Sequence, residues 1–352
     1  MTPLGQSLIR RIKADGPMTL AEYMAECLMH PQHGYYSTRD PFGEAGDFIT
    51  APEISQMFGE MLGLALAQAW IDQGRPDAFV LAELGPGRGT LMADILRATK
   101  GVAGFAKAAS VHLVETSPHL RARQVQTIGA PLTHHDSIDL LPSGPLYLVA
   151  NEFFDALPIR QFQRIDTNWH ERQIGLQGGA LAFGLTAPVS LPELEARHDA
   201  ADGDLVELCA PALAITAEIG ARIANHGGAA LIVDYGNWRS LGDTFQALKD
   251  HGFDDPLAHP GQADLTAHVD FHALAGAASP AATTPMTPQG VFLERLGITQ
   301  RAQVLAQSLT GEALKAHILA HRRLTHPEEM GNLFKVMAVF PPDKAAPFGF
   351  ET

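Results

Sequence analysis

The chain has 352 residues, of which 46% are hydrophobic and 18% are charged, a balance typical of a globular protein. Its 25 basic and 39 acidic residues give a net charge of −14, which argues against nonspecific nucleic-acid binding because phosphates require Lys and Arg. The two cysteines, Cys27 and Cys209, exclude a disulfide framework, and no early apolar stretch is long enough for a signal peptide or a membrane span. We therefore expect a cytoplasmic protein with no stable membrane insertion.

The first 75 residues predict a helical region that carries a long loop. Two helices are predicted within residues 1–30, the second with a capping box formed by Thr19 and Glu22. Residues 31–55 are rich in turn formers but also hold side chains of the buried type, which indicates an ordered loop. These side chains are Tyr35, Tyr36, Phe42, Phe48 and Ile49. A strongly periodic helix is predicted over residues 53–70.

From residue 76 onward, apolar strands alternate with helices. The predicted strands are 79–84, 111–114, 131–134, 146–150, 229–233 and 333–340. The predicted helices are 90–100, 211–225, 292–296, 310–323 and one that follows Ser117-Pro118. A spacing of about 30 residues and continuous apolar strands predict a doubly wound α/β fold, with a mostly parallel sheet covered by helices on both faces.

Two segments interrupt this alternation. The first, near residues 159–205, begins with an alternating polar and apolar pattern that predicts an antiparallel hairpin. The second, near residues 237–290, is rich in Gly, His, Asp and Ala. We therefore expect an N-terminal helical and lid region over residues 1–75 and a core domain over residues 76–352 that carries both insertions.

Three glycines at alternate positions, Gly85, Gly87 and Gly89, follow the first strand and its acid Glu83. Glycines let the backbone turn tightly and approach a ligand, while the helix that begins next presents free N–H groups and the positive end of its dipole. The dinucleotide fingerprint places its third glycine one residue later, so this spacing favours S-adenosylmethionine over NAD. An ordinary glycine turn before a helix stays open as the alternative.

Two acids follow the next strands. Glu115 ends the second strand, 26 residues after Gly89, where a carboxylate can accept hydrogen bonds from both ribose hydroxyls of an adenosine. Asp136 follows the third strand, in a loop that reaches the adenine in this topology. We predict that Asp136 accepts a hydrogen bond from the adenine amino group, although an Asp that caps a turn explains the residue nearly as well.

The fourth strand leads directly into Asn151-Glu-Phe-Phe-Asp155. N-methyltransferases often carry a short motif at this place, commonly Asn or Asp, two prolines and an aromatic residue, which holds the acceptor nitrogen in line with the methyl sulfonium. In this sequence two acids flank two phenylalanines instead. Carboxylates suit a guanidinium, which pairs with them through two parallel hydrogen bonds. We predict that Glu152, Asn151 and Asp155 are catalytic and that Asn151 also contacts the cofactor. The alternative is that the two phenylalanines belong to the core.

The long N-terminal loop supplies the predicted lid and acceptor channel, with Tyr35, Asp47, Phe48 and Glu53 as its contributing residues. The histidine pairs spaced four residues apart, at 268/272 and 317/321, lack an accompanying acid–histidine constellation. We therefore predict no metal site.

The combined motifs resemble the MidA-like family, the mitochondrial complex I assembly methyltransferases. The resemblance covers essentially the whole chain, with Asn151-Glu-Phe-Phe-Asp-Ala-Leu-Pro158 as its most distinctive part. The other matching segments are 30–36, 46–59, 83–91, Asp234-Tyr-Gly236, 264–271 and 330–337. Ala51 departs from the Ser of many relatives, a small change that puts little in doubt.

The resemblance implies a class I S-adenosylmethionine-dependent methyltransferase core with inserted segments. The mitochondrial members are protein arginine methyltransferases, and their target is the 49-kDa subunit of respiratory complex I. We therefore predict an enzyme that methylates arginine in a protein substrate and releases S-adenosylhomocysteine, located in the mitochondrial matrix if the source is eukaryotic. A non-catalytic assembly factor, a small-molecule methyltransferase and a homodimer stay open.

Overall fold

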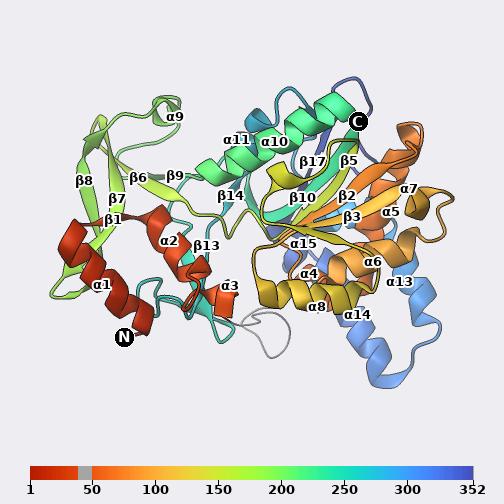
Figure 1. The fold of residues 1–352 in the computed structure, drawn as a ribbon, viewed down its shortest axis with the longest axis horizontal. Coiled ribbons are helices and arrows are strands. Elements are labelled where there is room, and N and C mark those ends of the chain that lie inside the picture. The colour runs from red at the N-terminus through yellow and green to blue at the C-terminus, as the bar shows by residue number, and fades with distance from the viewer. Residues whose placement is uncertain (39–49, 352) are drawn as a thin grey trace. The chain divides into compact units, whose positions relative to one another are not determined.

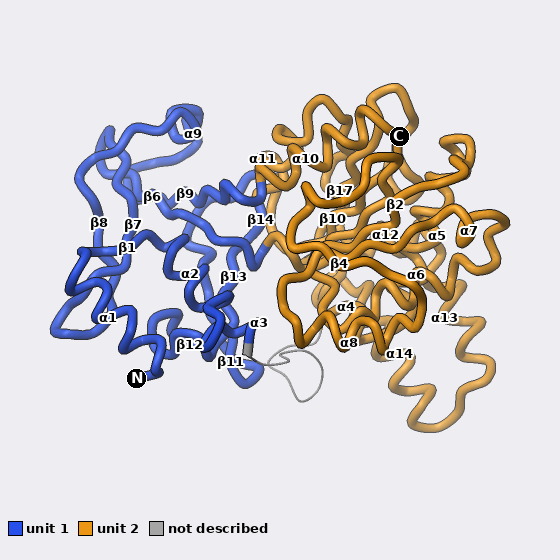
Figure 2. Tube along the Cα trace, in the orientation of Figure 1, with its two compact units in different colours: residues 1–48, 155–212, 239–269 blue, residues 49–154, 213–238, 270–352 orange. Residues whose placement is uncertain are grey.

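The computed structural model describes residues 1–38 and 50–351. The chain separates into two compact units, each assembled from three segments (Figure 2). Unit 1 comprises residues 1–48, 155–212 and 239–269, and unit 2 comprises residues 49–154, 213–238 and 270–352. The predicted N-terminal region is thus shared between the units, because the helix that ends it packs on the sheet of unit 2.

Unit 2 contains the predicted doubly wound sheet, whose strands run in the order β15-β17-β10-β5-β2-β3-β4. Strands β2, β3, β4, β5 and β10 pair in parallel, whereas β17 is antiparallel to β10. The bounds are β2 Phe79–Leu84, β3 Ala109–Val114, β4 Thr133–His135, β5 Leu146–Asn151, β10 Gly228–Asn237, β15 Ala282–Thr283, β16 Thr287–Pro288 and β17 Phe334–Phe340. The predicted mostly parallel α/β core is confirmed.

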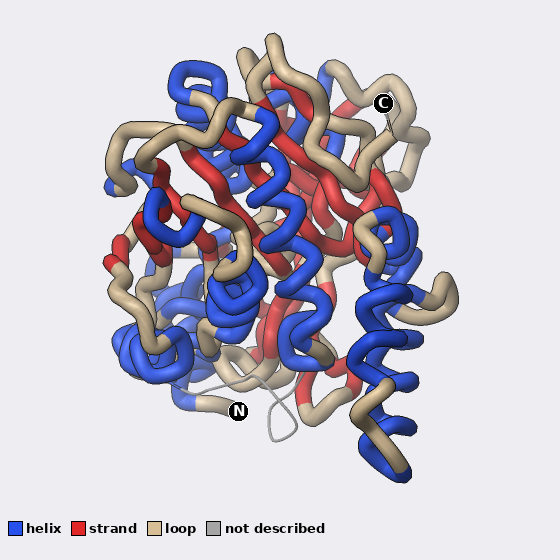
Figure 3. Tube along the Cα trace, turned by 90° about the vertical axis from the view of Figure 1, so that its right-hand side faces the viewer, coloured by secondary structure: helices blue, strands red, loops and turns tan. Residues whose placement is uncertain are grey.

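The helices of unit 2 bury both faces of this sheet (Figures 1 and 3). Leu81, Val149 and Leu231 belong to one core cluster with side chains of α5, while the alternate residues Leu148 and Ile232 are buried on the opposite face. The helix bounds are α4 Ala51–Ile54, α5 Gln56–Asp72, α6 Thr90–Thr99, α7 Phe105–Ala108, α8 Pro118–Ile128, α10 Ala210–His226, α11 Phe271–Ala277, α12 Gln289–Arg295, α13 Ile298–Ala306, α14 Gly311–Thr325 and α15 Met330–Leu333.

Unit 1 combines N-terminal helices with an antiparallel sheet, in the order β1-β7-β6-β9 with β8 paired to β7. The hairpin predicted in the first insertion is confirmed by β6, β7 and β8, and the second insertion forms a small sheet in the order β12-β11-β13. The bounds are α1 Pro3–Asp15, β1 Met18–Thr19, α2 Leu20–Met29, α3 Tyr35–Thr38, β6 Arg160–Ile165, β7 Asn168–Gln177, β8 Ala180–Val189, α9 Pro192–Glu195, β9 Leu205–Leu208, β11 Gln246–Lys249, β12 Gly252–Asp254 and β13 Asp264–Thr266.

One predicted helix is divided in the structure. The sequence predicts a continuous helix over residues 53–70, whereas α4 and α5 are separated at Ser55. Ser55 is extended, with φ −162° and ψ 137°, and its hydroxyl accepts a hydrogen bond from Met57 N–H at 3.2 Å as the N-cap of α5. The capping box predicted at Thr19 and Glu22 is confirmed. Within the described part of the chain, no helix is long and apolar enough to cross a membrane.

Candidate active site

The glycine loop after β2 has a backbone that only glycine adopts readily. Gly85, Gly87 and Gly89 have φ values of +59°, +51° and +83°, in the left-handed region. A Cβ at Gly85 would lie 2.8 Å from the ring of Phe153, and one at Gly89 would lie 3.2 Å from Ile128. Gly89 is the N-cap of α6 and makes no side-chain hydrogen bond to the first helical turn, where Met92 N–H donates to Glu83.

Two buried oxygens lie beside this loop without a hydrogen-bond partner among the described residues. They are Glu83 Oε2 and Asn151 Oδ1, at the ends of the neighbouring strands β2 and β5. Burial raises the pKa of Glu83 to about 8, although a backbone hydrogen bond from Met92 lowers it in part. Buried polar atoms are normally paired, so these open acceptors are suited to a polar ligand.

Glu115 follows β3 at the same edge of the sheet. Its carboxylate accepts hydrogen bonds from Ser117 N–H at 2.7 Å and from Gln124 Nε2 at 3.3 Å. Burial raises the pKa of Glu115, and the hydrogen bonds from Ser117 and Gln124 offset part of that rise. Gln124 also donates to the carbonyl oxygen of Gly87 at 2.8 Å, so the predicted ribose acid and the glycine loop share one hydrogen-bond donor.

Asp136 lies after β4, beside Glu115, as the topology predicts. Its side chain is 74% exposed and forms an ion pair with Arg121 at 2.6 Å. The Arg121 guanidinium also donates to the backbone oxygen of Glu115, with its Nε at 2.7 Å. The loops after β3 and β4 are therefore tied together by one arginine, which the sequence did not indicate.

The acceptor motif, residues 151–155, begins where β5 ends. Within it, Glu152 has a left-handed backbone, with φ +50°. That conformation is uncommon outside glycine, and strained residues of this kind cluster at functional sites. Glu152 N–H donates to the oxygen of Val233 at 2.9 Å, and Phe154 N–H donates to Asp234 Oδ2 at 3.0 Å. The end of β10 thus holds the motif in place. Asp234 is fully buried and received no role from the sequence.

Ala51 and Glu53 of α4, which precedes α5, contact the residues that follow β5 and β2 within unit 2. Ala51 N–H donates to Glu152 Oε1 at 3.2 Å, and Asn151 Nδ2 donates to the same oxygen at 3.0 Å. Glu53 accepts a hydrogen bond from the Thr90 hydroxyl at 2.6 Å and forms an ion pair with Arg88 of the glycine loop at 3.7 Å. Of the predicted lid residues, Glu53 therefore contacts the glycine loop, whereas Asp47 and Phe48 lie outside the described residues.

The remaining predicted site residues belong to unit 1. Tyr35 is fully buried and packs edge-on against Tyr36, with ring centroids 5.2 Å apart. The Asp155 backbone oxygen accepts a hydrogen bond from Ala267 N–H at 2.9 Å. Burial raises the pKa of Tyr36, and the negative charges of Asp264 and Asp155 raise it further. The structure therefore describes Asp155 in unit 1, while Glu152 and Asn151 are described in unit 2.

The chain matches known proteins over most of its length. Residues 61–289 match the model of a family described as "Putative S-adenosyl-L-methionine-dependent methyltransferase". The chain belongs to this family. It is also 38% identical over 371 residues to the Homo sapiens protein named protein arginine methyltransferase NDUFAF7, mitochondrial, across 97% of this chain and 84% of that protein. The Xenopus laevis protein of the same name is 38% identical over 365 residues, across 95% and 83% of the two chains.

Solved structures agree with this assignment. A Burkholderia thailandensis protein bound to S-adenosyl-homocysteine is 30% identical, with a TM-score of 0.84 across 98% of this chain and 93% of that one. A native crystal structure from the same organism is 31% identical, also with a TM-score of 0.84, across 99% and 94% of the two chains. The predicted class I fold, the MidA-like resemblance and S-adenosylmethionine as cofactor are confirmed: the chain is an S-adenosylmethionine-dependent methyltransferase.

The residues at the carboxyl edge of the sheet fit this cofactor. The left-handed glycine loop leaves room for close approach, and the open acceptors Glu83 Oε2 and Asn151 Oδ1 can pair with the polar groups of the methionine portion. Glu115 follows β3, the strand next to β2 in the sheet, where this topology places an acid that accepts from the ribose hydroxyls.

Proposed function

We propose that this enzyme methylates an arginine side chain in a protein, with Glu152 as the residue that binds the guanidinium. The observation that carries the proposal is the left-handed Glu152 at the end of β5, whose carboxylate is held by Ala51 N–H and Asn151 Nδ2. The names of the Homo sapiens and Xenopus laevis relatives support arginine as the acceptor.

The cofactor supplies a methyl group already activated on a sulfonium, so the chain has to position and polarise the acceptor. A guanidinium has five N–H donors in a fixed fork, which suits a carboxylate whose orientation is fixed. The hydrogen bonds from Ala51 N–H and Asn151 Nδ2 to Glu152 Oε1 hold the carboxylate in place. Asn151 and the glycine loop hold the methionine portion on the other side.

The proposed substrate is a 49-kDa-type subunit of respiratory complex I. The MidA-like resemblance supports this substrate. The Homo sapiens relative is named as a mitochondrial protein. In a bacterial cell the corresponding place is the cytoplasm, where the subunit is made.

The experiment is incubation of the purified chain with labelled S-adenosylmethionine and a lysate from a strain that lacks this protein, followed by peptide mass spectrometry. Methylarginine in the 49-kDa-type subunit is the expected result. Label confined to small molecules would instead identify a metabolite as the acceptor. Cofactor binding without any labelled product would identify a non-catalytic assembly factor. A Glu152→Gln variant that binds cofactor is the matched control.

A further inference from the structure

Gln124 lies on the inward side of α8 and has no exposed surface. Both ends of its amide are hydrogen-bonded: Nε2 lies 2.8 Å from the Gly87 oxygen and 3.3 Å from Glu115 Oε2, and Oε1 lies 2.8 Å from His134 Nε2. A fully buried amide with all of these contacts satisfied is held in one orientation.

The chemistry of the partners fixes that orientation. The Gly87 carbonyl and the Glu115 carboxylate only accept hydrogen bonds, so the amide nitrogen must face them. The amide oxygen then faces His134, whose Nε2 must carry a hydrogen. His134 lies in β4, so a side chain from this edge strand of the sheet sets the direction of the amide.

We propose that Gln124 is a positioning residue for the cofactor, which sets the distance between the glycine loop and the ribose-binding acid and is itself oriented by His134. This inference rests on the role of Glu115 proposed from the sequence. A carboxylate has about four acceptor sites. Ser117 N–H donates to one carboxylate oxygen of Glu115 and Gln124 Nε2 donates to the other, so Gln124 helps to fix the orientation in which Glu115 would meet the ribose.

The packing around Gln124 leaves no simple substitute for its amide. A Cβ at Gly89 would lie 3.3 Å from the Gln124 Cα, so α8 is packed directly against the glycine loop. Loss of the amide would leave the Gly87 carbonyl and Glu115 each without one donor in a buried place.

The test measures binding of S-adenosylhomocysteine by calorimetry. Gln124→Glu places a second carboxylate against Glu115 and removes both donated hydrogen bonds, so the dissociation constant should rise by about tenfold or more. The matched control is Gln126→Glu, the same change at an exposed position two residues along the same helix, which should alter the constant by less than about twofold. Equal effects of the two variants would overturn the proposal.

A second set of variants separates positioning from loss of packing. His134→Gln retains an N–H donor toward Gln124 and should bind nearly as well as the wild type, whereas His134→Phe should bind several-fold more weakly. In a double-mutant cycle, Gln124→Leu should weaken binding clearly in the wild type but little in a Glu115→Gln background. The proposal would be contradicted if Gln124→Leu raised the dissociation constant by the same factor in both backgrounds. Equal binding by the two His134 variants would contradict it as well.

The same measurements distinguish the two levels of inference. If Glu115→Gln binds S-adenosylhomocysteine as tightly as the wild type, the proposed role of Glu115 fails. If Glu115→Gln weakens binding while Gln124→Leu does not, only the positioning role of Gln124 fails. Thermal unfolding of each variant identifies any that does not fold. If a Gln124 variant does not fold, the comparison of His134→Gln with His134→Phe tests the positioning role of Gln124.

Discussion

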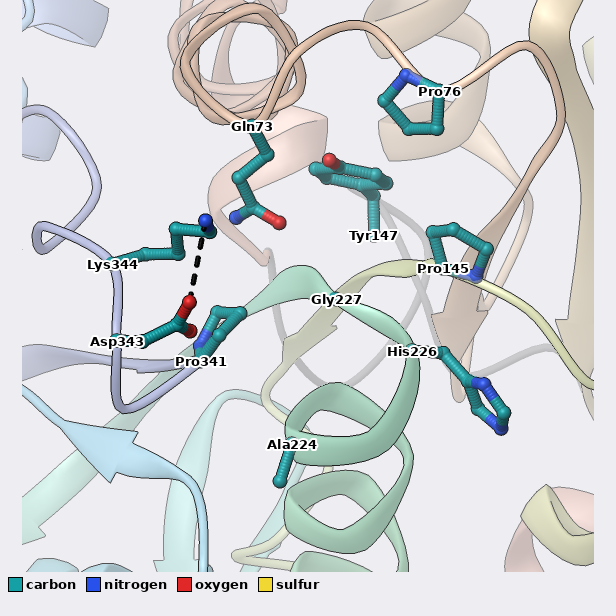
Figure 4. Close-up of a pocket in the computed structure, with 10 residues that line it drawn as sticks. All are labelled: Gln73, Pro76, Pro145, Tyr147, Ala224, His226, Gly227, Pro341, Asp343 and Lys344. Atoms are coloured by element: carbon teal, nitrogen blue, oxygen red, sulfur yellow. Dashed lines mark ion pairs between the residues drawn. The ribbon is translucent and has the colours of Figure 1, made fainter.

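At the carboxyl edge of the unit 2 sheet, Glu83 and Asn151 keep open acceptors and Glu152 has a left-handed backbone. At the amino edge of the same sheet lies a cavity of about 280 Å³, and Figure 4 shows the residues that line it. Gln73, after the end of α5, donates to the Gly228 oxygen at 2.9 Å and accepts from Gly228 N–H at 2.7 Å. Gln73 thus pairs with the backbone at the amino edge, whereas unpaired carboxylate and amide oxygens lie at the carboxyl edge.

The contrast follows from the direction of the chain. In a parallel sheet the carboxyl ends of the strands meet the N-termini of the following helices, whose N–H groups attract polar ligands. The amino edge meets helix C-termini, here those of α5 and α10, beside three proline residues. Tyr147 does leave a buried hydroxyl without a partner in the described structure at this edge, but a phenol stays neutral and costs less to bury than a carboxylate.

The sharpest test of the contrast is Glu152→Gln at the carboxyl edge. Methyl transfer should fall by about 100-fold, since a charge-assisted pair at the reacting centre is lost while the shape is kept. Cofactor affinity, measured by calorimetry, should stay close to that of the wild type. Loss of cofactor binding in this variant would instead assign Glu152 to the cofactor site, and full methyl transfer would show that the reaction does not need its charge.

Glu115→Ala should weaken cofactor binding by about 1.5–3 kcal/mol, the scale of hydrogen bonds to a charged group. Asp136→Asn is the comparison on the neighbouring loop. Its side chain is 74% exposed, and Asn keeps an oxygen that can accept the predicted hydrogen bond from the adenine amino group, so we expect a change of less than about 0.5 kcal/mol. If calorimetry showed a larger loss of cofactor affinity for Asp136→Asn than for Glu115→Ala, Asp136 would be the more important cofactor-binding acid.

Glu83 should make the free energy of unfolding depend on pH. Its folded pKa of about 8 is above the usual value of 4.5 for a glutamate, so between these values the folded chain holds a proton that the unfolded chain releases. The resulting stabilisation is complete below about pH 4.5 and is lost as the pH rises through 8, by about 2 kcal/mol between pH 6 and pH 8. Denaturant titrations should show this slope in the wild type and a reduced slope in Glu83→Gln.

The smallest effect is expected at the amino edge. Asp343 and Lys344 form an ion pair at 3.3 Å with side chains that are 71% and 48% exposed, so Asp343→Asn should change the free energy of unfolding by less than about 0.5 kcal/mol. Methyl transfer and cofactor affinity should be unchanged. A loss of either would mean that the cavity at this edge takes part in the reaction.

Local patterns in the sequence predicted the strands and the first turn of the site closely. The strand predicted at 79–84 is β2, and the strand predicted at 146–150 ends one residue later as β5. The glycines and Glu115 were identifiable because each lies directly after an apolar strand, where chain direction alone places it at the carboxyl edge. The helix break at Ser55 was missed, since helical periodicity continues through it.

The sequence by itself therefore determined the fold, the cofactor class and the edge of the sheet at which the acids lie, because strand burial and glycine turns are local properties. Only the tertiary structure decided how those acids are held. Gln124 and Gly87 are 37 positions apart, and Phe154 and Asp234 are 80 apart, so neither hydrogen bond leaves a local pattern. Such contacts form because buried donors and acceptors must find partners wherever the packed elements bring them together.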